Sequence, residues 1–117
     1  MTASAFSLSS LYGEAQFEVE QGEPVRGGLK TGPKHMFCES CSSWLFTIPE
    51  GLDDFVNVRS SSFDDAPAHR PYVDMWLGQG LGWVDSGAER KFETEPGEEE
   101  FGDLIAGYAG WERRVTQ

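Results

Sequence analysis

A period of two dominates this chain, because apolar and polar residues alternate over several short stretches. Such alternation is the pattern of β-strands with one buried and one exposed face. The stretches lie at residues 6–8, 17–20, 56–59 and 71–77, with the nearly all-apolar WLFTI at 44–48. Segments rich in glycine and proline separate them at the spacing of a mainly antiparallel fold. The pattern therefore predicts a mainly β protein, with its first strand expected over residues 6–12.

The period changes only near the C-terminus, where apolar residues recur at helical spacing. The stripe consists of Phe101, Leu104, Ile105, Tyr108 and Trp111. Acidic residues at 98–100 precede it, and Arg113 and Arg114 follow it. Acid at the start and base at the end both complement the helix dipole, so we expect one C-terminal helix.

Length and charge limit the classes of function. At 117 residues the chain is long enough for a single domain, spanning 1–117, with its own core. Its 20 acidic and 9 basic side chains give a net charge of −11, which repels nucleic acid and anionic membrane surfaces. The first residues lack the basic and apolar regions of a signal peptide, and no apolar run is long enough to span a membrane. We therefore expect a cytoplasmic protein, with neither nucleic acid nor a membrane as its partner.

The two cysteines, Cys38 and Cys41, form a Cys-x-x-Cys pair between two apolar stretches. In a reducing compartment such a pair favours metal binding or thiol chemistry over a structural disulfide. A thioredoxin-type redox pair opens a helix, whereas here Cys41 leads into the apolar stretch at 44–48. A pair on a tight turn between two strands has the geometry of a metal knuckle, which is the interpretation that we favour.

A structural zinc ion needs four ligands, so one knuckle is an incomplete site. The chain has two histidines, His35 and His69, and we interpret both as ordinary polar or loop residues. The remaining ways to complete the site are a second copy of the chain, which would give four sulfurs across a dimer, or a further segment. Thiol–disulfide exchange is the alternative that needs no metal.

Four stretches occur in an order that resembles a known family. They are HMFCESCSSWLF at 35–46, EGLDDFVNVRSSSFDD at 50–65, PYVDMWLGQGLGW at 71–83 and FETEPGEEEFGDLIAGYAGW at 92–111. Together they resemble the glutathione-dependent formaldehyde-activating enzyme family, whose eukaryotic relatives include centromere protein V. The resemblance extends over nearly the whole chain and implies a two-sheet β-tent, to which the residues themselves add a zinc-knuckle-like hairpin and one C-terminal helix. It also implies the family activity, that of a zinc-dependent carbon–sulfur lyase. The reaction is the reversible condensation of the glutathione thiol with formaldehyde.

The resemblance assigns Cys38 and Cys41 to the second half of a structural zinc site. Family members carry further cysteines just before the segment that MTASAF at 1–6 resembles, and no residue of this chain matches a catalytic zinc ligand. We therefore expect that an N-terminal metal-binding segment is missing, through a start at an internal methionine or a true truncation. The chain by itself is then expected to be inactive as a lyase, and the alternative is a non-catalytic β-tent interaction scaffold or an oligomeric remnant of the family fold. Ser42 and Ser43 also depart from the glycine or small residues that the family usually has after the second cysteine.

Arg26, Lys30 and Lys34 place three of the 9 basic residues in a glycine-rich segment before the cysteine pair. In an acidic protein this patch could guide an anionic thiol such as glutathione, and a solubilising loop is the alternative.

A missing N-terminal segment would leave a sheet edge without its neighbour, and such edges pair with other chains. We therefore expect a homodimer or higher oligomer, with residues 6–12 near the contact.

Overall fold

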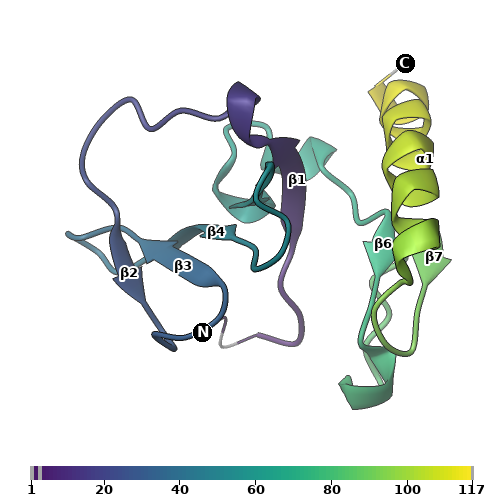
Figure 1. Ribbon diagram of the computed structural model, residues 1–117. Helices are drawn as coiled ribbons and strands as arrows, with labels where there is room; N and C mark the ends of the chain where they lie inside the picture. Colours follow the sequence, from purple (N-terminus) through teal and green to yellow (C-terminus); the bar gives the residue numbers. More distant parts are fainter. Residues whose placement is uncertain (1, 3, 117) are drawn as a thin grey trace. The chain divides into compact units, whose positions relative to one another are not determined.

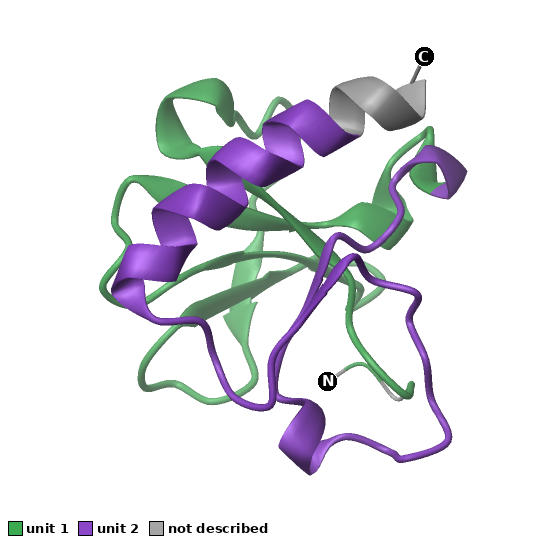
Figure 2. Ribbon diagram, turned by 90° about the vertical axis from the view of Figure 1, so that its right-hand side faces the viewer, with its two compact units in different colours: residues 1–66 green, residues 67–117 purple. Residues whose placement is uncertain are grey.

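The computed structural model describes residues 2 and 4–116, with side chains as far as residue 111. The chain forms two compact units, Met1–Ala66 and Pro67–Gln117, which Figure 2 distinguishes by colour. The first unit contains the larger sheet and the cysteine pair, and the second contains the long helix.

The first unit is built on one 5-stranded antiparallel sheet in the order β1-β5-β4-β3-β2. Figure 1 labels β1, β2, β3 and β4 of this sheet. Its strands are β1 (Ser9–Gly13), β2 (Val25–Gly27), β3 (Lys34–Phe37), β4 (Trp44–Ile48) and β5 (Phe55–Arg59). The strand β4 lies at the centre of the sheet, as expected for the most apolar segment of the chain. Phe46 and Thr47, which follow each other and therefore point to opposite faces, are both only 8% exposed. Both faces of the central strand are thus covered.

The core of the first unit lies on the Phe46 face of the sheet. Phe46 pairs with Val58, and Val56, two residues before Val58 and so on the same face, is 3% exposed. The ring of Phe17 covers that of Phe46, with the ring centres 4.8 Å apart. This apolar contact holds the segment after β1 against the sheet.

Two predicted strands of the first unit differ from the structure. The strand expected over 6–12 begins only at Ser9 and ends at Gly13. Residues 17–20 form no strand; they are irregular and follow a short 3-10 helix at Glu14–Gln16. Their alternation reflects the packing of Phe17 onto the sheet, without backbone pairing to a neighbouring strand, and Val19 is 41% exposed.

The strand β2, in contrast, lies in the segment that the sequence predicts to be a glycine-rich loop. Arg26 is its central residue and pairs with Met36. A Cβ atom at Gly27 would lie 2.5 Å from Cδ1 of Phe37, so this position requires glycine for the ring to lie across the edge strand. With only three residues and a glycine among them, β2 is too short to produce a detectable period.

The second unit contains β6 (Val73–Asp74), β7 (Arg90–Lys91) and the helix α1 (Glu98–Thr116). The helix confirms the prediction from the apolar stripe, and Leu104 and Trp111 are 5% and 8% exposed. The ring of Tyr72 lies 5.3 Å from that of Trp111 and packs against this face of the helix. The side chains of residues 113 and 114 lie outside the described residues. Within the described part of the chain, α1 included, no helix combines the length and the apolar character needed to cross a membrane.

The strand predicted over 71–77 is much shorter than expected. Only Val73 and Asp74 pair with another strand, and they pair with β7 in parallel. Trp76 adopts a left-handed backbone with φ of +61°, which ends the extended conformation, and a 3-10 turn follows at Leu77–Gln79. The fold is therefore mainly β, with a 5-stranded antiparallel sheet, a small parallel sheet and one C-terminal helix.

Candidate functional site

The cysteine pair lies on the turn that joins β3 to β4, as the spacing predicts, and it does not open a helix. Two backbone hydrogen bonds close the turn: Cys38 N–H donates to the Ser43 carbonyl at 2.8 Å, and Ser42 N–H donates to the Cys38 carbonyl at 2.9 Å. Ser42 has φ of +61°, a conformation that glycine adopts without cost and other residues seldom adopt. Ser42, which directly follows the second cysteine, thus occupies the position of the turn where the backbone conformation favours glycine.

The two sulfurs have different surroundings. Cys41 is exposed and Cys38 is partly buried. In the thiol form Cys41 donates to the Ser43 hydroxyl at 3.2 Å. In the thiolate form the sulfur accepts hydrogen bonds instead, first from the Ser43 side chain, then from the Ser43 backbone and from the Cys38 side chain, and these lower the pKa of Cys41. The thiolate is the form that binds metals, so the turn favours the ligand form of Cys41.

The described residues supply only part of a zinc site. Two sulfurs on one tight turn are suitable donors for zinc, which takes four ligands in structural sites. Among the side chains of residues 2 and 4–111, however, no group of three or more His, Cys, Asp or Glu is placed to hold a metal ion. The donor set therefore fits one half of a structural site and does not fit a complete one.

His35 is part of a hydrogen-bonded cluster on the opposite face of the sheet from Phe46. Its Nδ1 lies 2.8 Å from Thr47 Oγ1, and Trp44 Nε1 donates to the same oxygen at 3.0 Å. Because Thr47 accepts from Trp44, its own hydroxyl hydrogen can be donated to a neutral His35 ring. The His35 ring also contacts Trp44 edge-on, and the Arg59 guanidinium lies 4.4 Å above the Trp44 ring. These contacts give His35 a structural role and support its interpretation as an ordinary polar residue.

Lowering the pH from about 7.5 to about 5.5 is expected to destabilise the native chain through His35. Burial, and then the positive charge of Arg26, hold the pKa of His35 below its ordinary value of about 6.5. The unfolded chain therefore binds this proton first, and stability present above pH 6.5 or so is lost as the pH falls toward the lowered pKa. Urea unfolding of the native chain and of His35→Asn at both pH values measures the effect.

The asparagine variant is expected to lose less stability on acidification, since its side-chain oxygen keeps the acceptor for Thr47 without titrating. The same replacement at His69, in the second unit, is the control for loss of an imidazole. If the native chain and His35→Asn lose the same amount of stability between the two pH values, His35 is not the group responsible for the loss.

The three basic residues Arg26, Lys30 and Lys34 lie on one hairpin. Arg26 is in β2, Lys34 begins β3, and Lys30 lies in the loop between these strands, where its Nζ donates to the Arg26 carbonyl at 2.6 Å. Arg26 pairs with Met36, and Lys34 is two residues before Met36, so Arg26 and Lys34 emerge on the same face of the sheet. Lys30 and Lys34 are exposed, and Arg26 has a buried Nε that lacks a hydrogen-bond partner among the described residues. The segment is thus an ordered hairpin carrying positive charge.

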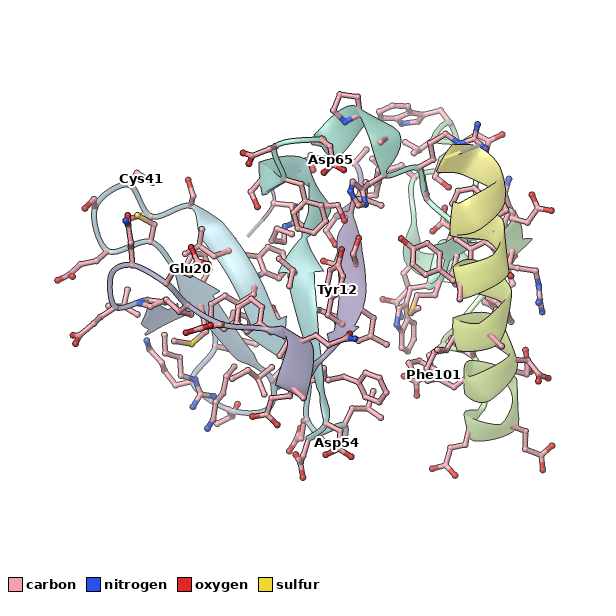
Figure 3. All side chains as sticks on the ribbon, turned by 90° about the horizontal axis from the view of Figure 1, so that it is seen from above. Tyr12, Glu20, Cys41, Asp54, Asp65 and Phe101 are labelled. Atoms are coloured by element: carbon pink, nitrogen blue, oxygen red, sulfur yellow. The ribbon has the colours of Figure 1, made fainter. Side chains whose placement is uncertain are left out.

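Figure 3 shows Cys41 on its turn, far from Tyr12 on β1 across the sheet. The turn lies between the third and fourth strands of the sheet order, counted from the β1 edge. The sequence identified the turn and the basic residues, but not the cluster of His35, Thr47 and Trp44. The register of β3 against β4 brings this cluster together, with an irregularity between Met36 and Phe37.

The fold and the turn define a mainly β protein with a cysteine pair on a hairpin. A family model described as "Glutathione-dependent formaldehyde-activating enzyme" matches residues 1–79, which is more than half of the 117 residues. The chain therefore belongs to the glutathione-dependent formaldehyde-activating enzyme family. No match was found among curated proteins or among solved structures.

Proposed function

We propose that this chain is a thiol-binding β module of its family. In this proposal Cys38 and Cys41 provide two ligands of a structural zinc ion, and the β2–β3 hairpin attracts the anionic substrate. The substrate class is glutathione or a similar thiol, together with its aldehyde adducts. The observation that carries the proposal is the family match over residues 1–79, which includes the whole first unit and its cysteine turn.

The charge distribution supports the role of the hairpin. The chain has a net charge of −11, so its average field repels an anion. Arg26, Lys30 and Lys34 oppose that field locally, within one hairpin whose loop lies at the end of β3 opposite to the cysteine turn. Glutathione is anionic at neutral pH, and a local positive potential raises its concentration near the β2–β3 hairpin.

The lyase step places a further demand on the chain. Condensation of a thiol with formaldehyde forms a bond between sulfur and the carbonyl carbon and moves the thiol proton to the carbonyl oxygen. In metal-assisted chemistry of this kind, a zinc ion supplies Lewis acidity and activates the thiol. Within the described residues the turn brings two soft ligands together, which is fewer than a catalytic zinc site needs. We therefore propose that this chain does not catalyse the condensation unless further ligands are supplied from elsewhere.

One nuclear magnetic resonance experiment with ¹³C-formaldehyde and glutathione tests both parts of the proposal. The native chain with added zinc is expected to shift or broaden the glutathione signals and to leave the formaldehyde–glutathione exchange rate unchanged. The double variant Lys30→Gln/Lys34→Gln is expected to weaken glutathione binding by about fivefold to tenfold at low salt, because two exposed charges are lost. Lys91→Gln is the matched control, since Lys91 lies in the second unit and pairs with Asp85 at 3.0 Å.

Each outcome decides one part. Equal glutathione binding by the native chain and by the double variant would show that the β2–β3 hairpin does not attract the thiol. Faster exchange in the presence of the chain would show that it is an active lyase. No glutathione binding at all would favour the non-catalytic β scaffold.

A further inference from the structure

The strand β1 is one edge of the 5-stranded sheet, and its hydrogen-bonding groups can be assigned from the register. The flanking residues Leu8 and Glu14 bond toward β5: Ser60 N–H donates to the Leu8 carbonyl at 3.1 Å, and Glu14 N–H donates to the Asp54 carbonyl at 2.7 Å. In an antiparallel pair the direction alternates with each residue. Ser10 and Tyr12 therefore also bond to β5, and the backbone groups of the other three strand residues point away from the sheet. These residues are Ser9, Leu11 and Gly13.

Nothing in the described part of the chain pairs with these outward groups. The backbone hydrogen bonds of residues 2 and 4–116 include none from β1 to a strand other than β5. Unpaired N–H and C=O groups along an edge are a template for another strand, since each gains a partner when a strand is added.

The two edges of the sheet differ in protection. The other edge, β2, carries Arg26 at its centre and follows Pro24, and charge and proline are the usual means of blocking edge pairing. The sequence of β1, SSLYG, contains neither a charged residue nor proline. In a chain with a net charge of −11, a strand without charged residues adds no like-charge repulsion of its own when two copies pair.

We propose that β1 pairs with β1 of a second copy of this chain, antiparallel about a two-fold axis at Leu11. In this register Leu11 lies opposite Leu11 of the second copy, and Ser9 lies opposite Gly13 of the second copy. All three outward-pointing residues then fall in hydrogen-bonded pairs, so every outward N–H and C=O of the edge gains a partner. The two sheets join into one continuous sheet, and the interface is isologous, as two-fold symmetry requires.

This geometry excludes a zinc ion shared between the two cysteine turns. Each turn joins β3 to β4, and β5 and β1 separate β4 from the interface on each side. With neighbouring strands about 4.8 Å apart, the two β4 strands lie about 24 Å from each other. A site of four sulfurs across the dimer would need the turns in contact, so the two kinds of dimer are mutually exclusive.

Sedimentation of the full chain over a range of concentrations tests the proposal. We expect a dimer for the native chain, and for Leu11→Pro a dissociation constant raised at least about 30-fold, which corresponds to the loss of two hydrogen bonds. Proline is suited to this position because the Leu11 N–H points away from β5 and takes no part in the intramolecular sheet. Leu11→Thr, which keeps the N–H and suits a strand, is the matched control and is expected to remain a dimer.

If proline disturbs the fold, two variants with a charged residue at position 11 still test the proposal. Leu11→Lys and Leu11→Glu place like charges opposite each other, so each variant alone is expected to be monomeric, and an equimolar mixture is expected to form dimers again. A monomeric native chain, or a dimer that all three of these charged or proline variants leave intact, would overturn the proposal. A dimer held by zinc and dissolved by a chelator would overturn it in favour of the shared site. Glutathione binding is independent of this interface, so its failure would concern the proposed function alone.

Discussion

Replacing Gly107 with alanine is expected to destabilise the second unit, while the same replacement at Gly102 in the same helix is expected to stabilise it. A Cβ atom at Gly107 would collide with the hydroxyl group of Tyr72, whereas one at Gly102 meets no atom within 4 Å. Alanine gains up to about 1 kcal/mol over glycine inside a helix, but overpacking costs about 1–3 kcal/mol. The two variants should therefore differ by about 2 kcal/mol in the free energy of unfolding.

The Tyr72 ring has little freedom to relieve the collision. It lies 5.3 Å from the ring of Trp111 and 5.8 Å from that of Tyr108, and the Arg70 guanidinium lies 5.3 Å above Trp111 on the same cluster. Denaturant unfolding followed by tryptophan fluorescence measures both variants under identical conditions. A Gly107→Ala variant as stable as Gly102→Ala would show that Tyr72 does not pack closely against the helix.

The strongest periodic patterns gave the most reliable predictions. The stretch WLFTI became β4 with the expected bounds, and the apolar stripe became α1, because both segments bury enough apolar surface to determine their own conformation. The stripe was not uniformly buried: Leu104 is 5% exposed and Ile105 is 40% exposed. A helical period identifies which face of a helix is buried, but it does not show which residues at the border of that face remain exposed.

The failures occurred where a strand depends on a neighbour that periodicity does not reveal. Residues 17–20 alternate well, but no strand is adjacent to receive their hydrogen bonds. Of residues 71–77, only Val73 and Asp74 have a partner strand, the short β7. Arg26 shows the opposite failure. It lies in a segment that glycine marks as a loop, yet the pairing of β2 with β3 makes it a strand.

The candidate site was predicted only in its local part. The spacing of Cys38 and Cys41, followed directly by an apolar strand, was sufficient to place them on a turn. The contacts of His35 were not predictable, because they depend on which residue of β4 lies opposite β3, and that register includes an irregularity before Phe37. Backbone pairing over a distance in sequence is set by the whole sheet.

The replacement of either cysteine by serine is expected to abolish binding of a soft metal ion to the first unit. The turn provides two sulfurs, and removal of one leaves a single thiolate, which cannot hold zinc against water. Cobalt(II) gives sulfur-to-metal absorption bands that report directly on thiolate coordination. These bands are expected for the native chain and are expected to be absent from Cys38→Ser and from Cys41→Ser. Ser42→Gly is the control that should retain the bands. It keeps both sulfurs and places glycine at the residue with the left-handed backbone conformation.

The central claim is that the cysteine turn is one half of a metal site, and protection of its thiols by zinc tests this most directly. Mass spectrometry can follow the alkylation of Cys38 and Cys41 in the full chain, with and without zinc, alongside the number of zinc ions bound per chain. We expect zinc to slow the alkylation of both cysteines together, with no more than one zinc ion per chain and with ready loss to a chelator, because the turn supplies half of the ligands. Alkylation at the same rate with and without zinc would contradict the claim, since it would show that neither sulfur binds the metal.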